Sequence, residues 1–500
     1  MWNPGLMAHL TRRRFAGCIA GSLAAARLSA IPPRPKLFVL LLAEQFRSDY
    51  LSRFSALFGP GGFRRLMEEG SYLPDCRMSA ISFSASGLET IATGAYPQAH
   101  GIVAESWYDP ESRKMVTASA AGSQATTLAD EIVSADPRNR VFVMDADGSR
   151  AWLLARRVPH RVLALARPAG AEAEWVEAFR QSHSPQRFKN AKWQALQADA
   201  NAPPLRVLLD DPADDYMALY NASPFAQETQ FDFLRTAITE EKLGQGPALD
   251  FVTVILSQMA QLGYEVGADS PLMREMVLHL DRQIELTLEA LKKVPGVGFA
   301  FAAAHGAPDH DGRRVNGASV AQVIDQALSE AYDVPSAKNR YVERYVYPFV
   351  YLNHNQLSRY DVDLRAARRL AGEAAMRLAP GVAAYYTADG DCSRSGDWLR
   401  RFQNSFHALR SGDVMLAYEP NAVEEYGAGR GISYGSLYNY DVQTPLLFYG
   451  SQFHARTVES PVEPIDIAPT LARALRVAAP SSSTGRVLGD VFAPDKKGEK

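Results

Sequence analysis

The chain of 500 residues has only three cysteines, Cys18, Cys76 and Cys392, and only ten histidines. It has no Cys-x-x-Cys pair and no cysteine–histidine cluster, which excludes a zinc finger. Its formal net charge is −3, so it lacks the excess of basic residues with which proteins bind nucleic acid. A disulfide between Cys76 and Cys392 stays open, because sequence alone cannot place two cysteines within bridging distance.

The N-terminal region lacks the ~20 consecutive apolar residues that a membrane-spanning helix needs. Its apolar stretch, Ala16 to Ala26, is about half that length, follows Arg12-Arg13-Arg14 and precedes Pro32-Pro33. This order predicts a twin-arginine signal peptide and linker over residues 1–35. We therefore expect an exported, periplasmic protein with no stable membrane span, whose last residues, 491–500, form a flexible tail.

What the chain does have is 47% hydrophobic residues, arranged as short apolar runs that alternate with amphipathic segments. Runs bounded by turn residues predict strands buried on both faces of a parallel sheet: Leu37 to Ala43, Val141 to Met144, Phe251 to Leu256, Phe299 to Ala304, Val346 to Leu352 and Pro445 to Tyr449. Helical spacing predicts helices over Gly62 to Glu69, Met273 to Leu291, Ser319 to Ala331, Leu364 to Leu378 and Ile465 to Leu475. The alternation predicts an α/β fold, a doubly wound, mainly parallel sheet with helices on both faces. Residues 155–245 break the pattern and predict an inserted cap over the carboxyl edge of the sheet, where such folds bind ligands.

Four segments carry a resemblance to a known family. They are Glu44 to Leu51 after the first strand, Ser82 to Gly94, Ala304-His305-Gly306, and Tyr434 to Leu488. Together they resemble the alkaline phosphatase superfamily, in its branch of type I phosphodiesterase/nucleotide pyrophosphatase-like alkaline phosphatases. The segments keep the family's order, so the resemblance implies one α/β domain over residues 36–490.

The resemblance implies a chemistry in which two zinc ions hold the attacking and leaving oxygens of a phosphate ester. At the metal positions, the family's first aspartate falls on Glu44 and its nucleophile on Ser84. The next aspartate and histidine fall on Ala260 and Tyr264. An adjacent Asp-His pair falls on Ala304 and His305, and the last histidine on Tyr434. Only Glu44, Ser84 and His305 then offer metal-binding atoms.

The positions that hold the phosphate in the family are altered as well. An asparagine falls on Glu105, whose negative charge would repel a phosphoryl oxygen at this substrate-binding position. A lysine falls on Gly148, whereas Arg150 matches the family.

Several of these residues have a second interpretation. Ser84 is either a nucleophile or a cap for the backbone N–H groups of the helix that follows it. His305 is either a ligand or a hydrogen-bonded relic, and Arg150 either holds an anion or pairs with Asp145, Asp147 or Glu44. Asp309, His310 and Asp311 form either a new metal site or a solvated turn.

The leading hypothesis is therefore a pseudoenzyme or binding protein that has lost the two-metal site and needs no cofactor. The first alternative is an active hydrolase of phosphate or sulfate mono- or diesters that uses Ser84 in a rebuilt or metal-free site, with zinc only if the site still functions. The second is a periplasmic binding module for an anionic small molecule.

Overall fold

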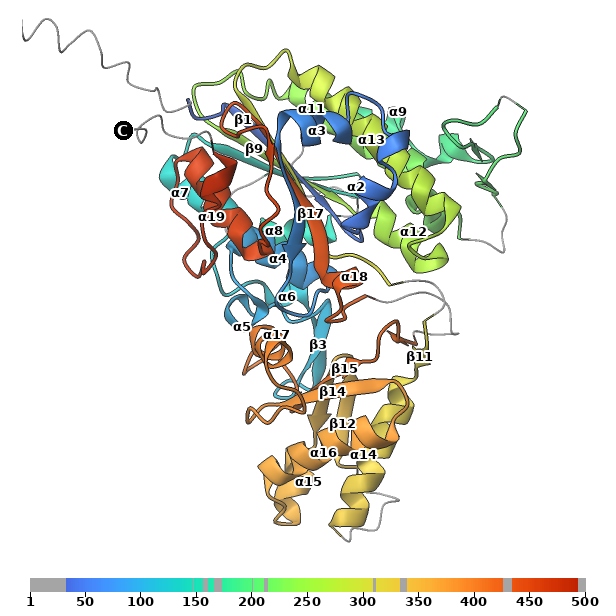
Figure 1. Ribbon diagram of the computed structural model, residues 1–500, viewed down its shortest axis with the longest axis vertical. Coiled ribbons are helices and arrows are strands. Elements are labelled where there is room, and N and C mark those ends of the chain that lie inside the picture. The colour runs from blue at the N-terminus through green and yellow to red at the C-terminus, as the bar shows by residue number, and fades with distance from the viewer. Residues whose placement is uncertain are drawn as a thin grey trace, which may run out of the picture.

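The computed structural model describes residues 33–146, 148–155, 161–165, 173–199, 201–210, 215–308, 312–332, 340–425 and 434–492, and its largest element is an eight-stranded sheet (Figure 1). In spatial order its strands are β18 (Arg456–Thr457), β2 (Ser71–Arg77), β17 (Gln443–Gly450), β10 (Val297–Ala303), β1 (Leu37–Ala43), β9 (Asp250–Leu256), β5 (Arg140–Asp145) and β6 (Arg161–Ala164). All neighbours are parallel except those of β17, which runs antiparallel to β10 and β2. The predicted doubly wound, mainly parallel α/β fold is confirmed.

Alternate residues of β1 point into two different apolar cores, which is why the strand is buried over its whole length. Leu37, Val39 and Leu41 pack on one face against a group of helices that includes α2 (Asp49–Arg53), α3 (Phe63–Glu69), α11 (Pro224–Glu240), α12 (Gln258–Val266) and α13 (Pro271–Leu291). Phe38 and Leu40 pack on the other face against a group that includes α4 (Ser84–Thr93), α7 (Leu128–Ala135), α8 (Ser149–Leu154) and α19 (Ile467–Leu475). Figure 1 shows the two helical layers on opposite sides of the sheet.

A second lobe, at the bottom of Figure 1, has its own antiparallel sheet of β12 (Val342–Val346), β13 (Phe349–Leu352), β15 (Val414–Tyr418) and β14 (Val382–Thr387). Helices α14 (Gly317–Ala331) and α16 (Leu364–Leu378) share a hydrophobic core with it. The prediction of one parallel strand over Val346 to Leu352 is therefore wrong. Tyr347 and Pro348 form the turn between β12 and β13, where the missing N–H of proline removes no ladder hydrogen bond.

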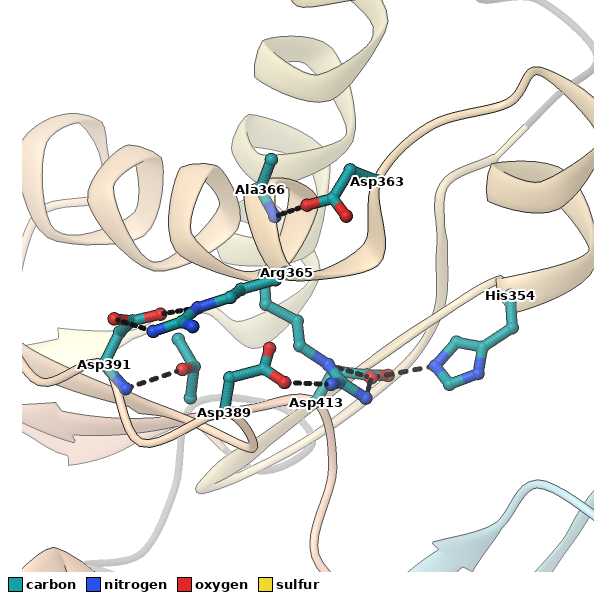
Figure 2. Close-up of polar contacts among 9 residues, drawn as sticks. His354, Asp363, Arg365, Ala366, Asp389, Asp391 and Asp413 are labelled. Carbon is teal, nitrogen blue, oxygen red and sulfur yellow. Dashed lines mark hydrogen bonds and ion pairs between the residues drawn. The ribbon is translucent and has the colours of Figure 1, made fainter.

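Asp413 organises the polar side of the second lobe (Figure 2). Its buried carboxylate accepts hydrogen bonds from the backbone N–H of Leu352 at 2.7 Å and from Arg368 Nε at 2.8 Å, and His354 Nε2 lies 2.8 Å away. Arg368 also donates to Asp389 at 3.0 Å. Burial opposes the charge of Asp413, but its hydrogen bond with His354 and its other partners keep the pKa of Asp413 below its usual value. The same hydrogen bond raises the pKa of His354.

Shorter elements connect these parts of the chain, among them α6 (Ala118–Ala121), α15 (His354–Arg359) and α18 (Asn439–Val442). Within the predicted insertion, 155–245, lie α9 (Glu174–Ser182), β7 (Lys192–Trp193), β8 (Arg206–Val207), α10 (Tyr216–Asn221) and α11; its role as a cap stays a prediction. Three small sheets pair β7 with β8, β3 (Ser106–Asp109) with β4 (Lys114–Thr117), and β11 (Arg314–Val315) with β16 (Val423–Glu424). Of the helices that the structure describes, none is long and apolar enough to cross a membrane. Cys76 and Cys392 are both free thiols. The predicted signal peptide up to residue 32, the Asp309-His310-Asp311 run and the tail from residue 493 lie outside the described residues.

Candidate functional site

The site forms where β1, β9 and β10 end side by side, because parallel strands deliver the residues that follow them to one edge of the sheet. Glu44 follows β1, and its N–H donates to the carbonyl of Leu256 at the end of β9 at 3.0 Å. His305 lies just beyond β10, and its carbonyl accepts from the N–H of Phe46 at 2.9 Å. Backbone hydrogen bonds thus fix Glu44 and His305 on the same edge.

Helix α4 brings Ser84 to this edge. Its Gly87 packs so closely on the end of β10 that a Cβ at this position would lie 2.4 Å from the carbonyl oxygen of Ala304. Ser84, the first residue of the helix, is fully buried, and its Oγ lies 2.8 Å from His305 Nε2. Ser84 does not cap the helix: the N–H of Ala85, its second residue, donates to Glu105 at 2.8 Å, and the N–H of Phe83, the residue before the helix, donates to the hydroxyl of Ser86 at 3.1 Å.

The surroundings of His305 decide where its proton resides. Burial lowers the pKa of His305 to about 3, so the ring is neutral near pH 7. Its Nδ1 lies 2.7 Å from the carbonyl oxygen of Gly306, an acceptor, so the single ring proton resides on Nδ1. Nε2 is then the acceptor that faces the hydroxyl of Ser84. This is the arrangement of a nucleophile beside a general base.

Tyr434 contacts both Ser84 and His305. Its ring stacks on His305 with centroids 3.9 Å apart, and its hydroxyl is hydrogen-bonded to Ser84 Oγ over 3.0 Å. Burial raises the pKa of Tyr434, so it keeps its proton. The hydroxyl of Ser84 is therefore enclosed between a histidine and a tyrosine.

Glu44 and Arg150 form a direct ion pair at the centre of the site. Glu44 is fully buried, and burial raises its pKa to about 7 against the opposing effect of Arg150. The position of the arginine is fixed because the backbone N–H of Arg150 donates to the carboxylate of Asp145 at 2.9 Å. Two positions earlier, Gly148 precedes the first residue of α8 with φ of 81°, a left-handed conformation that disfavours a lysine there. Of the partners considered for Arg150, Glu44 pairs with its guanidinium and Asp145 accepts from its backbone N–H, whereas Asp147 lies outside the described residues.

Glu105 occupies the N-terminus of α4. Its Oε1 accepts a hydrogen bond from the N–H of Ala85 at 2.8 Å. Unpaired N–H groups and the helix dipole make such an end attractive to anions. Here the protein's own carboxylate takes that place.

Comparison with known proteins identifies the frame that carries this arrangement. The sequence model of the type I phosphodiesterase / nucleotide pyrophosphatase family matches residues 38–431. The chain belongs to this family.

Individual relatives match over most of their length. The chain is 25% identical to alkaline phosphatase PafA of Elizabethkingia meningoseptica, over 95% of this chain and 97% of that protein. It is 24% identical to alkaline phosphatase PhoV of Synechococcus elongatus, over 92% and 93%. The crystal structure of wild-type PafA superimposes with a TM-score of 0.80 at 23% identity, covering 92% of this chain and 99% of that one.

The residues at this phosphodiesterase-family site do not fit a pair of zinc ions. The carboxylate of Glu44 contacts Arg150, and both ring nitrogens of His305 have hydrogen-bond partners. On α12, Ala260 has no ligand atom, and Tyr264 is 38% exposed. Ala304 is buried at the end of β10 and likewise has no side-chain ligand. Throughout the part of the chain that the structure describes, no three His, Cys, Asp or Glu side chains are grouped to hold a metal.

Sequence reasoning brought Glu44, Ser84, Glu105, Arg150 and His305 to one site but missed two partners. Tyr434 was considered only as a substituted ligand, yet its hydroxyl is hydrogen-bonded to Ser84. Asp441 was not considered at all. Its carbonyl accepts from Gly306 N–H at 2.6 Å, its carboxylate accepts from Ser436 N–H at 2.8 Å, and burial raises its pKa to about 6. No local motif marks the contact of Tyr434 with Ser84 or that of Asp441 with Gly306, because each joins segments more than 100 residues apart in the sequence.

Proposed function

We propose that this member of the family has lost the two-metal ester hydrolase site and acts as a pseudoenzyme or binding protein. The observation that carries the proposal is the Glu44–Arg150 ion pair. A carboxylate that should bind a metal and a guanidinium that should bind a phosphate instead neutralise each other. A buried charge is stable only when it is paired, so the pair both fills the site and removes the need for a metal.

Glu105 supports the same proposal. Its carboxylate lies on the N–H of Ala85, beside Ser84, where a phosphoryl oxygen would have to bind. Among the residues that the structure describes at this site, a phosphate dianion would meet Glu44, Glu105 and Asp145 against the positive charge of Arg150. The charge balance therefore opposes binding of a phosphate monoester.

Turnover assays test the proposal. The mature chain, purified with and without added zinc, is offered p-nitrophenyl phosphate, bis-p-nitrophenyl phosphate and p-nitrophenyl sulfate. We expect no hydrolysis above that of Ser84→Ala with any of them. Hydrolysis that requires zinc and disappears in Ser84→Ala would contradict the loss of the metal site.

A metal-free hydrolase is the second candidate, and the 2.8 Å contact between Ser84 Oγ and His305 Nε2 favours it. In such an enzyme Ser84 Oγ would attack the phosphorus or sulfur atom of the ester while His305 Nε2 takes its proton. The bond from that atom to the ester's alkoxide oxygen would break, and His305 would give the proton to the leaving alcohol. Hydrolysis that survives a chelator but is lost in both Ser84→Ala and His305→Gln would support this candidate over the pseudoenzyme.

We also propose that the chain is exported through the twin-arginine segment at Arg12-Arg13-Arg14. The test is fractionation of cells that express the full chain. Export should be lost when Arg12 and Arg13 are both replaced by lysine, because this pathway reads the arginines themselves.

A further inference from the structure

Two neighbouring cavities lie beside α17 (Asp397–Ser405), and none of their lining residues is Glu44, Ser84, Arg150 or His305. In Figure 1 this helix lies between α5 (Pro97–His100) and the strands of the second lobe. The first cavity, of about 470 Å³, is formed with the end of β2 and with the segment from Pro461 to Asp466; we call it the arginine cavity. The second, of about 520 Å³, is formed with residues 437–440; we call it the aromatic cavity. Asp397 and Arg401 line both, and each volume lies within the ~300–1,000 Å³ typical of small-molecule sites.

The arginine cavity is lined by more positive than negative side chains. Its four arginines are Arg77, Arg400, Arg401 and Arg486, and its three carboxylates are Asp397, Glu463 and Asp466. The side chains of Arg77, Arg400 and Arg486 are 41%, 57% and 64% exposed, so they are accessible to a ligand. A guanidinium has five N–H donors, more than its ion pairs here use. The wall can therefore donate several charge-assisted hydrogen bonds to an anion.

Protein contacts hold this wall in place before any ligand arrives. Glu463 accepts hydrogen bonds from Ser79 at 2.7 Å and from Tyr96. Arg401 pairs with Asp397 at 2.7 Å and also donates to the carbonyl of Leu437 at 2.5 Å. A site whose side chains are already ordered loses less entropy on binding.

The aromatic cavity is lined by three aromatic rings in addition to Asp397 and Arg401. Trp398 and Tyr438 lie edge to face with centroids 5.7 Å apart, and Tyr438 stacks with Tyr440 at 5.7 Å. The hydroxyl of Tyr438 donates to the carbonyl of Tyr418 at 3.1 Å, and that of Tyr440 accepts from Asn421 N–H at 2.8 Å. The polar ends of both tyrosines are thus satisfied within the protein, and all three rings are only partly buried. They can stack against a flat ring of a ligand.

We propose that the two cavities form one binding site for a small anion that carries a planar ring. The phosphate, phosphonate or carboxylate group of the ligand binds in the arginine cavity, and its ring binds in the aromatic cavity. Asp397 and Arg401, which line both cavities, lie between the two groups. The proposal does not rest on the proposed function, because neither Ser84 nor His305 lines the cavities, which would serve an active or an inactive chain.

Isothermal titration calorimetry on the full mature chain tests the proposal with three probes. Phenylphosphonate carries both the anion and the ring and cannot be hydrolysed, methylphosphonate carries the anion alone, and benzyl alcohol carries the ring alone. We expect phenylphosphonate to bind about tenfold more tightly than either of the others, since both cavities contribute. Arg400→Ala should weaken both phosphonates about tenfold, and Trp398→Leu should remove most of the advantage of the phenyl group.

Matched variants separate this site from others. Arg369→Ala removes a similarly exposed arginine of the second lobe (65% against 57% for Arg400), and Arg150→Met removes the arginine that pairs with Glu44; neither should change the affinity for phenylphosphonate. Arg486→Ala replaces Arg400→Ala if the latter does not fold. No binding of phenylphosphonate, equal affinities for the two phosphonates, or a loss confined to Arg150→Met would each overturn the proposal.

Discussion

Removal of Arg150 should expose how Glu44 is stabilised. In Arg150→Met the apolar body of the side chain is kept, but the fully buried carboxylate loses the guanidinium that contacts it. Removing one partner of a buried ion pair leaves the other charge buried and unpaired, which lowers the free energy of unfolding by about 3 kcal/mol or more. Because the side chain of Arg150 is 23% exposed, we expect the lower end of this range, about 3 kcal/mol, seen as a fall of a few degrees in Tm.

The same variant carries a pH signature. The pKa of Glu44, about 7 in the folded protein, is above its unfolded value, so the native chain loses stability as pH rises towards 7. Without Arg150 this pKa rises further, and the loss continues above pH 7. The difference in Tm between Arg150→Met and the native chain should therefore be small at about pH 5.5 and large at about pH 8.5.

Scanning calorimetry at both pH values checks the prediction, and the double variant Glu44→Gln/Arg150→Met is its control. With no charge left to bury, the double variant should regain most of the lost stability at the higher pH. A decrease in Tm that is equal at both pH values, or one that Glu44→Gln does not reverse, would refute the view that the two residues stabilise each other.

Three further predictions concern other parts of the molecule. Glu105→Gln removes the carboxylate that binds the N–H of Ala85, so millimolar phosphate should raise the Tm of this variant but not that of the native chain. An equal effect of phosphate on both proteins would contradict the view that Glu105 occupies the anion site at the N-terminus of α4. Asp413→Asn should lower the free energy of unfolding by about 3 kcal/mol, and with it the Tm, because Arg368 and the N–H of Leu352 lose the carboxylate that accepts their hydrogen bonds. An unchanged Tm would contradict the role given to Asp413 in Figure 2. The folded pKa of His354 is raised by Asp413, so its stabilisation is present below the unfolded pKa and disappears as pH rises through the folded one. His354→Asn should therefore lower the Tm at about pH 6 and leave it unchanged at about pH 9, whereas the same decrease at both would contradict this assignment.

The main sheet was predictable because its central strands are buried on both faces. Continuous apolar runs such as 37–43 and 251–256 have no other stable place in an α/β domain, and they fall within β1 and β9. The second lobe was not recognised as a separate sheet. Its strands are short, and the apolar character of residues 346–352 continues through the turn at Tyr347 and Pro348, which hides the hairpin.

The site was predictable as a set of residues but not as a set of contacts. Ser84, Arg150 and His305 each follow a strand or begin a helix, and parallel topology brings such positions to one edge. Which carboxylate pairs with Arg150 depends on side-chain geometry across three segments, so Glu44 could not be chosen over Asp145 in advance. The contact between Tyr434 and Ser84 spans 350 residues and has no local pattern.

The zinc content of the purified mature chain tests the central claim most directly. The protein is produced with added zinc, freed of loosely bound metal by gel filtration, and analysed by mass spectrometry of the element. Because Glu44 is paired with Arg150 and His305 with Ser84, we predict far less than one zinc per chain. About two zinc ions per chain, retained through purification, would mean that the site still holds the metals of an ester hydrolase and would contradict the account.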